Sequence, residues 1–351
     1  MPHVLAFLLL PFAWLYALVL GVRNWLYDRG LKTSTAYPVP VISVGNLRAG
    51  GTGKTPHVAW MVGQLLRAGE KPAVLSRGYG RRTRGYVRAD AAATAATIGD
   101  EPLQHYQDFG GQVPVAVDED RRTGIAALLE TQPALTAVVL DDAYQHRRVR
   151  PAFNILLTEQ PRPFYHDFVL PAGRLRESRR GAARADVVIV TKCAPDLSAA
   201  DQADITTRIR RYARPRVPVL FSTYDYGPPV AVGAAARPAG AEILLLTGIA
   251  QPGPLRDYLT QAGYQIVRHA TFADHHAFTP AELAAVVGQL RPGQSVFTTQ
   301  KDAVRLLEPA LQAALAGWPV FYIPIQVRFL ADGAARLQSL LRPLFQPQAV
   351  V

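Results

Sequence analysis

Short apolar runs rich in β-branched residues recur along most of the chain and alternate with stretches of helical periodicity. Before residue 224 the expected strands are 39–45, 71–76, 113–117, 136–140, 153–157, 186–190 and 217–221, and the expected helices are 54–67, 121–130 and 199–212. These strands are apolar throughout instead of alternating, so helices should cover both faces of their sheet. The pattern predicts an α/β fold with a mostly parallel sheet.

A stretch rich in Pro, Gly and Ala, residues 224–241, interrupts this pattern. A shorter series follows, with expected strands at 242–248, 265–269, 295–299 and 320–325 and expected helices near 253–262, 280–290 and 301–316. We therefore expect a first domain at 31–223, a linker at 224–241 and a smaller second α/β domain at 242–351. Ligands often bind in the cleft between two such domains.

The N-terminal run, residues 4–20, contains no charged side chain. As a helix it would reach about 26 Å, slightly short of the ~30 Å hydrocarbon core of a bilayer. Pro11 interrupts it and no basic segment precedes it, which disfavours a cleaved signal peptide. Trp, Tyr and then basic residues follow, as is typical of a cytoplasmic membrane surface. We expect residues 1–30 to form a membrane-anchoring helix, peripheral or monotopic through 4–22; a spanning helix stays open.

The stretch "GNLRAGGTGKTPHVAW", residues 45–60, follows an expected buried strand and opens an expected helix. It matches a phosphate-binding P-loop, except that Arg48 takes the place of the first glycine of the Walker A spacing. Glycines let backbone N–H groups approach phosphate oxygens, the Lys contacts the β- and γ-phosphates, and the Thr hydroxyl binds Mg²⁺. The expected nucleotide-binding residues are Gly50, Gly51, Thr52, Gly53, Lys54 and Thr55.

Two aspartates, Asp141 and Asp142, end the buried strand in "TAVVLDDAYQH". A Walker B carboxylate, which holds the Mg²⁺ shell, belongs at such a strand end. Aspartate pairs also cap helices, so this interpretation depends on the neighbouring P-loop. Together the two motifs predict ATP and Mg²⁺ as cofactors.

Acidic and histidine residues also occur in "IGDEP" (98–102) and "FADHHAF" (272–278). The first follows an uncertain strand and could be an acidic helix start; the second precedes a helix with a capping box at Thr279. An Asp oriented by a His can accept a proton from a hydroxyl in a kinase. A zinc site is disfavoured, because adjacent histidines point different ways and no cysteine partners exist. A surface loop without a role stays open.

Basic residues outnumber acidic ones by 38 to 27 among 351 residues, which gives a net charge of +11 and predicts an anionic partner. Many lie in the arginine-rich segments 76–85 and 171–181. Neither segment carries interleaved aromatics, so anionic lipid headgroups are favoured over nucleic acid. The single cysteine, Cys193, excludes an internal disulfide and a multi-cysteine metal site.

In their order along the chain, these motifs resemble those of the tetraacyldisaccharide 4'-kinases, which phosphorylate the lipid A precursor at the cytoplasmic face of the inner membrane of Gram-negative bacteria. The resemblance covers nearly the whole chain and rests on "SVGNLRAGGTGKTP", "LSRGYGRR", "GDEP", "DEDR", "LDDAYQHRR", "LPAGRLRES", "FADHHAF" and "TTQKDAVRL". It implies an ATP-dependent kinase for the 4'-hydroxyl of an acylated disaccharide 1-phosphate in lipopolysaccharide biosynthesis. The implied partners are this anionic lipid and the inner-membrane surface, without nucleic acid; the oligomeric state is open.

The resemblance also implies roles for individual residues. Asp100 and His275 would form a dyad that takes the proton from the 4'-hydroxyl, while Lys54 contacts the phosphates. The metal residues would be Thr55, Asp141, Asp142, Glu101 and Glu177, and the substrate residues Tyr79, Arg121, Gln145, His146 and Arg176. In this family a short β linker tethers the second domain, which closes over ATP.

A membrane-associated P-loop ATPase of the switch or positioning type is the alternative. Its loop "K-G-G-x-G-K-[ST]" is similar to "AGGTGKT", but this chain has Ala49 where that class has lysine. Such an ATPase would not need the "FADHHAF" motif. The sequence therefore favours the kinase.

Overall fold

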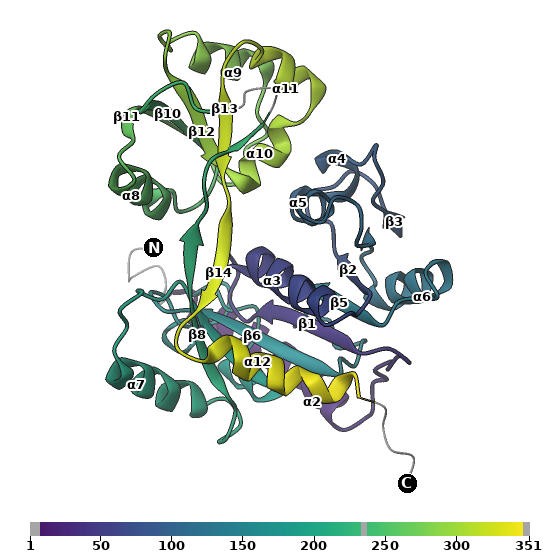
Figure 1. Ribbon diagram of the computed structural model, residues 1–351. Helices are drawn as coiled ribbons and strands as arrows, with labels where there is room; N and C mark the ends of the chain where they lie inside the picture. The colour runs from purple at the N-terminus through teal and green to yellow at the C-terminus, as the bar shows by residue number, and fades with distance from the viewer. Residues whose placement is uncertain (1–7, 233–236, 347–351) are drawn as a thin grey trace.

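The computed structural model describes residues 8–232 and 237–346, which form two β-sheets with helices on their faces (Figure 1). The larger sheet has nine strands in the order β14-β8-β7-β6-β1-β5-β2-β4-β3. Their bounds are β1 (Val41–Asn46), β2 (Pro72–Ser76), β3 (Val87–Arg88), β4 (Val115–Val117), β5 (Ala137–Asp141), β6 (Phe153–Glu159), β7 (Val187–Thr191), β8 (Val219–Tyr226) and β14 (Ile325–Phe329). From β8 to β4 every neighbouring pair is parallel, so the predicted α/β class is confirmed.

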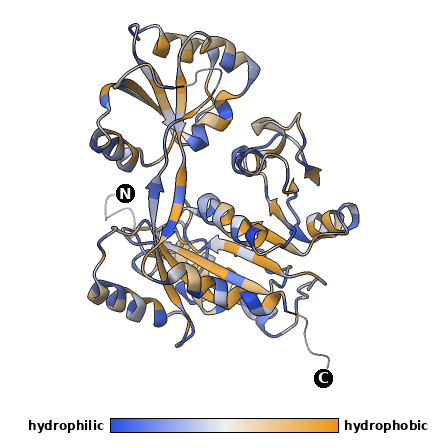
Figure 2. Cartoon of the chain, viewed as in Figure 1, coloured by the Kyte–Doolittle hydropathy of each residue, from blue (hydrophilic) through white to orange (hydrophobic). Residues whose placement is uncertain are grey.

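Helices cover both faces of the larger sheet. Successive strand residues point to opposite faces, and in the central strands the residues on both faces are buried. On one face Ile42 packs in a core with α3 (Lys54–Arg67), α5 (Asp100–Asp108) and α12 (Gly333–Leu341). On the other face Val41 packs with α6 (Arg121–Thr131), and further along the same face α7 (Ala199–Arg210) contributes Ile209. Figure 2 shows hydrophobic colouring along the central strands of both sheets.

The smaller sheet has the order β11-β10-β12-β13-β9. Its strands are β9 (Val230–Ala231), β10 (Glu242–Thr247), β11 (Gln265–Thr271), β12 (Ser295–Thr299) and β13 (Val320–Ile323). The helices around it are α8 (Gly253–Gln261), α9 (Pro280–Val287), α10 (Gln300–Leu306) and α11 (Pro309–Ala314). Its strands are parallel except β9, which pairs antiparallel with β13.

Two antiparallel strands, β8 and β14, join the two sheets (Figure 1). β8 leaves the larger sheet, and β14 returns to it after the whole smaller sheet has been formed. The structure therefore differs from the boundaries expected from the sequence. Residues from Ile325 onward belong to the larger sheet and its core instead of the second unit, and β9 makes part of the expected linker a strand of the smaller sheet.

The N-terminal helix α2 (Leu10–Asp28) presents an apolar surface to solvent. Among its residues only Ala13 is buried, and the large side chains exposed on it include Phe12, Trp14, Leu18 and Trp25. The predicted anchor begins at residue 4, so residues 4–7 of it lie outside the described part. Within the described residues, none of the helices has the length and apolar character needed to cross a bilayer.

The segment before "GDEP" is helical, which corrects the expectation of a strand there. Helix α4 (Ala95–Ile98) begins at a capping box formed by Thr94 and Thr97, and Gly99 separates it from α5. The positive φ of Gly99, 92°, lets the chain turn sharply between the two helices. Asp100 and Glu101 then lie in the first turn of α5, where the helix dipole favours negative charge.

Candidate active site

The P-loop connects the end of β1 to the start of α3, as the sequence predicts. β1 lies between β5 and β6 in the middle of the sheet. Gly53, at the N-cap of α3, has a φ of 84° and its backbone lies against the hydroxyl of Tyr224; a Cβ there would be 1.7 Å from that oxygen. Gly50, with a φ of 120°, faces open space. The loop thus keeps the backbone exposure that phosphate binding needs.

Side chains at the ends of β1 and β7 hold the loop in shape. Asn46 donates to the Thr52 hydroxyl at 2.6 Å, and the Thr191 hydroxyl donates to the Thr52 carbonyl at 2.9 Å. Lys192 donates to the Gly51 carbonyl at 2.6 Å. The Thr52 side chain is therefore a buried internal support of the loop, and what it offers a nucleotide is its backbone.

Arg48 occupies the place of the missing Walker glycine, and its side chain points to two carboxylates. Its guanidinium donates to Asp167 at 2.7 Å and to Glu159 at 3.1 Å. Lys192 pairs with the same Glu159. The arginine thereby ties the loop to the end of β6, which explains how the loop is kept without a glycine at this position.

Asp142, directly after β5, lies beside the loop. Its carboxylate is 3.6 Å from Lys54 Nζ and accepts two hydrogen bonds from Arg176, at 2.9 and 3.0 Å. Burial raises the pKa of Asp142, but the charges of Lys54 and Arg176 outweigh it and lower that pKa below its usual range. The residue has a φ of 53°, in the left-handed region that aspartate adopts more readily than most residues.

Asp141 is buried on the last position of β5, where Oδ2 lies 3.3 Å from Nε2 of His105 on α5. Its Oδ1 is also buried and has no hydrogen-bond partner among the described residues. Such an atom is costly unless a water or a bound group satisfies it. A carboxylate oxygen without a partner, next in sequence to the Asp142 that pairs with Lys54, fits a hydrated Mg²⁺.

The donor set fits Mg²⁺–ATP better than a metal bound by protein alone. The described residues contain no group of three or more His, Cys, Asp or Glu side chains arranged for a metal. Magnesium usually takes one or two protein ligands and completes its shell with phosphates and water. Thr55, Asp141 and Asp142 could supply that protein share, and Lys54 with the open glycines could hold the phosphates.

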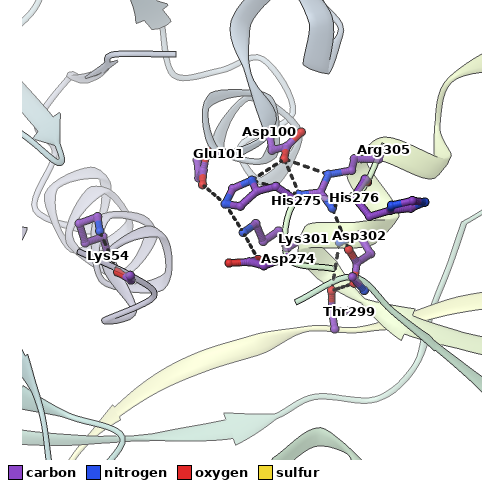
Figure 3. Close-up of polar contacts among 12 residues, drawn as sticks. Lys54, Asp100, Glu101, Asp274, His275, His276, Thr299, Lys301, Asp302 and Arg305 are labelled. Atoms are coloured by element: carbon purple, nitrogen blue, oxygen red, sulfur yellow. Dashed lines mark hydrogen bonds and ion pairs between the residues drawn. The ribbon is translucent and has the colours of Figure 1, made fainter. Parts of the chain in front are cut away.

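The second half of the site joins the two sheets (Figure 3). Asp100, on the first turn of α5, lies with its Oδ2 3.2 Å from Nδ1 of His275, which follows β11. His275 Nε2 is 3.9 Å from Glu101 and 2.8 Å from Nζ of Lys301. Arg305 donates through Nε to the same Asp100 oxygen at 2.9 Å. Residues far apart in sequence, predicted as a pair, are thus brought together.

Asp100 is held as an anion. Burial raises its pKa, but hydrogen bonds from His275 and Arg305 and the Arg305 charge outweigh burial and lower the pKa of Asp100 to about 2. His275 has a φ of 61°, in the left-handed region that is uncommon outside glycine. Its backbone N–H donates to the Gly248 carbonyl at 3.2 Å, which holds the loop in this conformation.

Three of the expected substrate residues lie around these two clusters. The Tyr79 side chain is exposed and its ring lies 6.1 Å from the ring of His275. Arg121 is buried and donates to the Asp118 carbonyl at 2.8 Å; burial lowers its pKa to about 10. His146 Nε2 lies 3.3 Å from Asp120. Of these three, Tyr79 is the one that faces solvent next to the dyad.

The side chains of Gln145 and Glu177, expected at the substrate and at the metal, contact each other in the structure. Gln145 donates to the Asn46 carbonyl and to Glu177, at 2.8 and 2.9 Å. The buried Glu177 also accepts from Asn24 of α2 at 2.9 Å and from Arg184 at 2.8 Å. With donors on both oxygens, Glu177 holds α2 to the P-loop strand in this structure, whereas the sequence placed it at the metal.

A match to a family model decides the relationship. The model described as tetraacyldisaccharide-1-P 4'-kinase matches residues 5–345. The chain belongs to this family. The resemblance drawn from the motifs is thereby confirmed.

Curated relatives and a solved structure agree with this. The chain is 44% identical over 333 residues to the tetraacyldisaccharide 4'-kinase of Cytophaga hutchinsonii, covering 93% of each protein. It is 43% identical over 344 residues to that of Bacteroides thetaiotaomicron, covering 92% of this chain and 89% of the relative. A crystal structure of the Aquifex aeolicus family member in complex with ATP superposes with a TM-score of 0.76 at 27% identity, covering 97% of this chain and 100% of the other.

Sequence reasoning missed several residues at this family's site. Arg305 and Lys301 lie in the quoted motif "TTQKDAVRL", yet no role was assigned to them. Lys192 directly follows the apolar strand β7, which β6 separates from β1, the strand that leads into the loop. Its place at a strand end was a usable signal. The sequence pattern could not predict which carboxylate each of these three basic side chains would contact.

Proposed function

We propose that this chain is an ATP-dependent kinase that transfers a phosphoryl group to the 4'-hydroxyl of a tetraacyldisaccharide 1-phosphate, the activity for which its curated relatives are named. Family membership over nearly the whole chain supports the reaction class. The observation that carries the chemistry is the meeting of Asp100 and His275 across the two sheets, in a chain whose P-loop is intact.

The residues divide the work of phosphoryl transfer. Positioning and charge neutralisation dominate such reactions, and Lys54 with the loop glycines would bind the phosphates. Mg²⁺, held by Thr55, Asp141 and Asp142, would neutralise phosphate charge when bound. Asp100 would accept the hydrogen bond of the 4'-hydroxyl. With a pKa of about 2 it is a weak base, so it would align the hydroxyl and take up its proton late.

Phosphate transfer from labelled ATP to the acylated disaccharide 1-phosphate in detergent micelles tests the reaction. Lys54→Ala should abolish transfer, and Asp100→Ala should lower kcat much more than it weakens lipid binding. Arg328→Gln, at an exposed ion pair with Asp225, is a matched control that should behave like the parent protein. A parent protein that hydrolyses ATP without labelling the lipid would instead support the switch-type ATPase.

The exposed apolar side chains of α2 favour attachment to the cytoplasmic surface of the inner membrane. Scattered exposed hydrophobics are ordinary, but Trp14, Leu15, Leu18 and Val22 lie on one short helix. Deleting residues 1–22 should release the protein from sedimented membranes while activity on dispersed substrate partly remains. Complete retention on membranes would contradict the role of the helix.

A further inference from the structure

Arg305 connects the two sheets through both sides of its guanidinium group. It lies on α10, beside the smaller sheet, and is 6% exposed. One nitrogen, Nη1, donates to Asp302 of the same helix at 3.0 Å. The other side donates to Asp100 of α5, through Nε at 2.9 Å and through Nη2. Figure 3 shows Arg305 between these two carboxylates.

The contacts on Asp100 all fall on one oxygen. Oδ2 receives both Arg305 donors and also lies 3.2 Å from Nδ1 of His275. Arg305 and His275 therefore fix the rotation of the carboxylate, and Oδ1 is not used by this cluster. With the carboxylate held in this way, Oδ1 is available to an acceptor hydroxyl.

Lys301 sets which nitrogen of His275 carries the hydrogen. Its Nζ is 2.8 Å from His275 Nε2 and 3.2 Å from Asp274. An ammonium group can only donate, so Nε2 must accept and the ring hydrogen lies on Nδ1, where it faces Asp100. This tautomer makes the Nδ1–H of His275 the third donor to Oδ2, beside the two from Arg305.

Arg305 is anchored on its own side independently of Asp100. Asp302 is completely buried and also accepts from the Gly248 backbone at 2.9 Å and from Thr299 at 2.7 Å. Breaking such a buried network is costly, so Arg305 should stay with α10 if the two sheets separate. Asp100 would then lose its contacts with Arg305 and with His275. The contact between Gln300 and Asp108, at 2.6 Å, would open at the same interface.

We propose that Arg305 is a positioning residue that aligns Asp100 for the acceptor hydroxyl only when α10 lies against α5. Closure of the two sheets and alignment of Asp100 are then one event, because Arg305 of α10 and His275 both reach the same Asp100 oxygen of α5. This inference rests on the proposed kinase function. It assigns to Arg305 an effect on the rate of transfer and none on ATP binding.

Arg305→Gln and Arg305→Lys, measured in the full-length protein, test the proposal. Positioned acid–base groups contribute about 10²–10⁴-fold, so Arg305→Gln should lower kcat by roughly 100-fold. The KM for ATP should stay within about twofold, since no phosphate contact is removed. Arg305→Lys keeps a positive charge beside the buried Asp302, which supports folding, but it lacks the forked geometry of the guanidinium group. Its kcat should therefore exceed that of Arg305→Gln by less than about tenfold. Arg256→Gln, an exposed arginine of the same unit, is the control.

A double-mutant cycle separates positioning from general stability. If Arg305 acts through Asp100, then Arg305→Gln should cost little in an Asp100→Asn background. Added guanidinium ion should partly restore kcat of Arg305→Ala, an effect that a merely destabilised protein would not show. A folded Arg305→Gln with kcat within about twofold of the parent, or full additivity in the cycle, would overturn the inference. If the parent protein itself fails to label the lipid, the proposed function fails first.

Discussion

The contact between Gly53 and Tyr224 leads to a quantitative prediction about the P-loop. A Cβ on Gly53 would lie 1.7 Å from the Tyr224 hydroxyl, and the backbone there has a φ of 84°. A left-handed conformation costs a non-glycine residue about 1–2 kcal/mol. Forcing an additional carbon into a packed site costs about 1–3 kcal/mol more. Gly53→Ala should therefore lower the free energy of unfolding by roughly 2–5 kcal/mol.

Tyr224→Phe provides the matched background for this measurement. The hydroxyl is buried and has no hydrogen-bond partner among the described residues, so its removal should leave stability unchanged or raise it by about 1 kcal/mol. The next atom, Cζ, lies 3.0 Å from the added carbon. In the Tyr224→Phe chain the cost of Gly53→Ala should fall toward the backbone part, about 1–2 kcal/mol.

Urea unfolding, followed by circular dichroism, gives the four free energies of this cycle, and ATP titration reports on the loop itself. The coupling between the two changes should be about 1–3 kcal/mol, and the double variant should bind ATP better than Gly53→Ala alone. An equal cost of Gly53→Ala in both backgrounds would refute the reasoning. It would show that the loop avoids the hydroxyl at no energetic cost.

Three further predictions concern buried groups. Burial lowers the pKa of His57 from 6.5 to about 4, so the unfolded chain takes up a proton before the folded one as the pH falls. The free energy of unfolding, measured in urea, should therefore drop by up to about 3 kcal/mol between pH 7 and 4. The drop should be smaller in His57→Asn. Burial raises the pKa of Cys193 to about 12, so iodoacetamide at pH 8 should label it only after urea unfolding; rapid native labelling would contradict this. Leu337→Ala should cost about 2–5 kcal/mol, whereas the exposed Arg336→Ala should cost almost nothing, as measured by urea unfolding.

Much of the fold was predictable because its signals are local. Apolar strands, glycines before Lys54 and the aspartates after β5 follow from rules that span only a few residues. The boundary of the second unit was not predictable, because β14 is a short strand that pairs with β8 about one hundred residues earlier. Nothing in the five residues of β14 states which sheet they join.

The site divides in the same way. The P-loop and the Asp100–His275 pair were named from motifs, and the structure brings the pair within hydrogen-bonding distance. The roles of Gln145 and Glu177 depend on a partner on α2, Asn24, which lies 153 positions before Glu177. Motif membership shows that such residues belong near a site. Only the fold distinguishes those that face a ligand from those that hold a helix in place.

The return of the chain through β14 has a consequence for how the protein is made. Helix α12 follows β14, and its Leu337 and Leu341 complete the core that also contains Val58 and Met61 of α3. During synthesis the ribosome must therefore deliver the entire smaller sheet before the P-loop helix is fully packed. Until then an apolar face of the larger sheet stays uncovered. Hydrophobic surface that is exposed for a time in this way makes a partly folded chain prone to aggregate. We expect this interval to be when the nascent chain is most prone to aggregate or to need a chaperone.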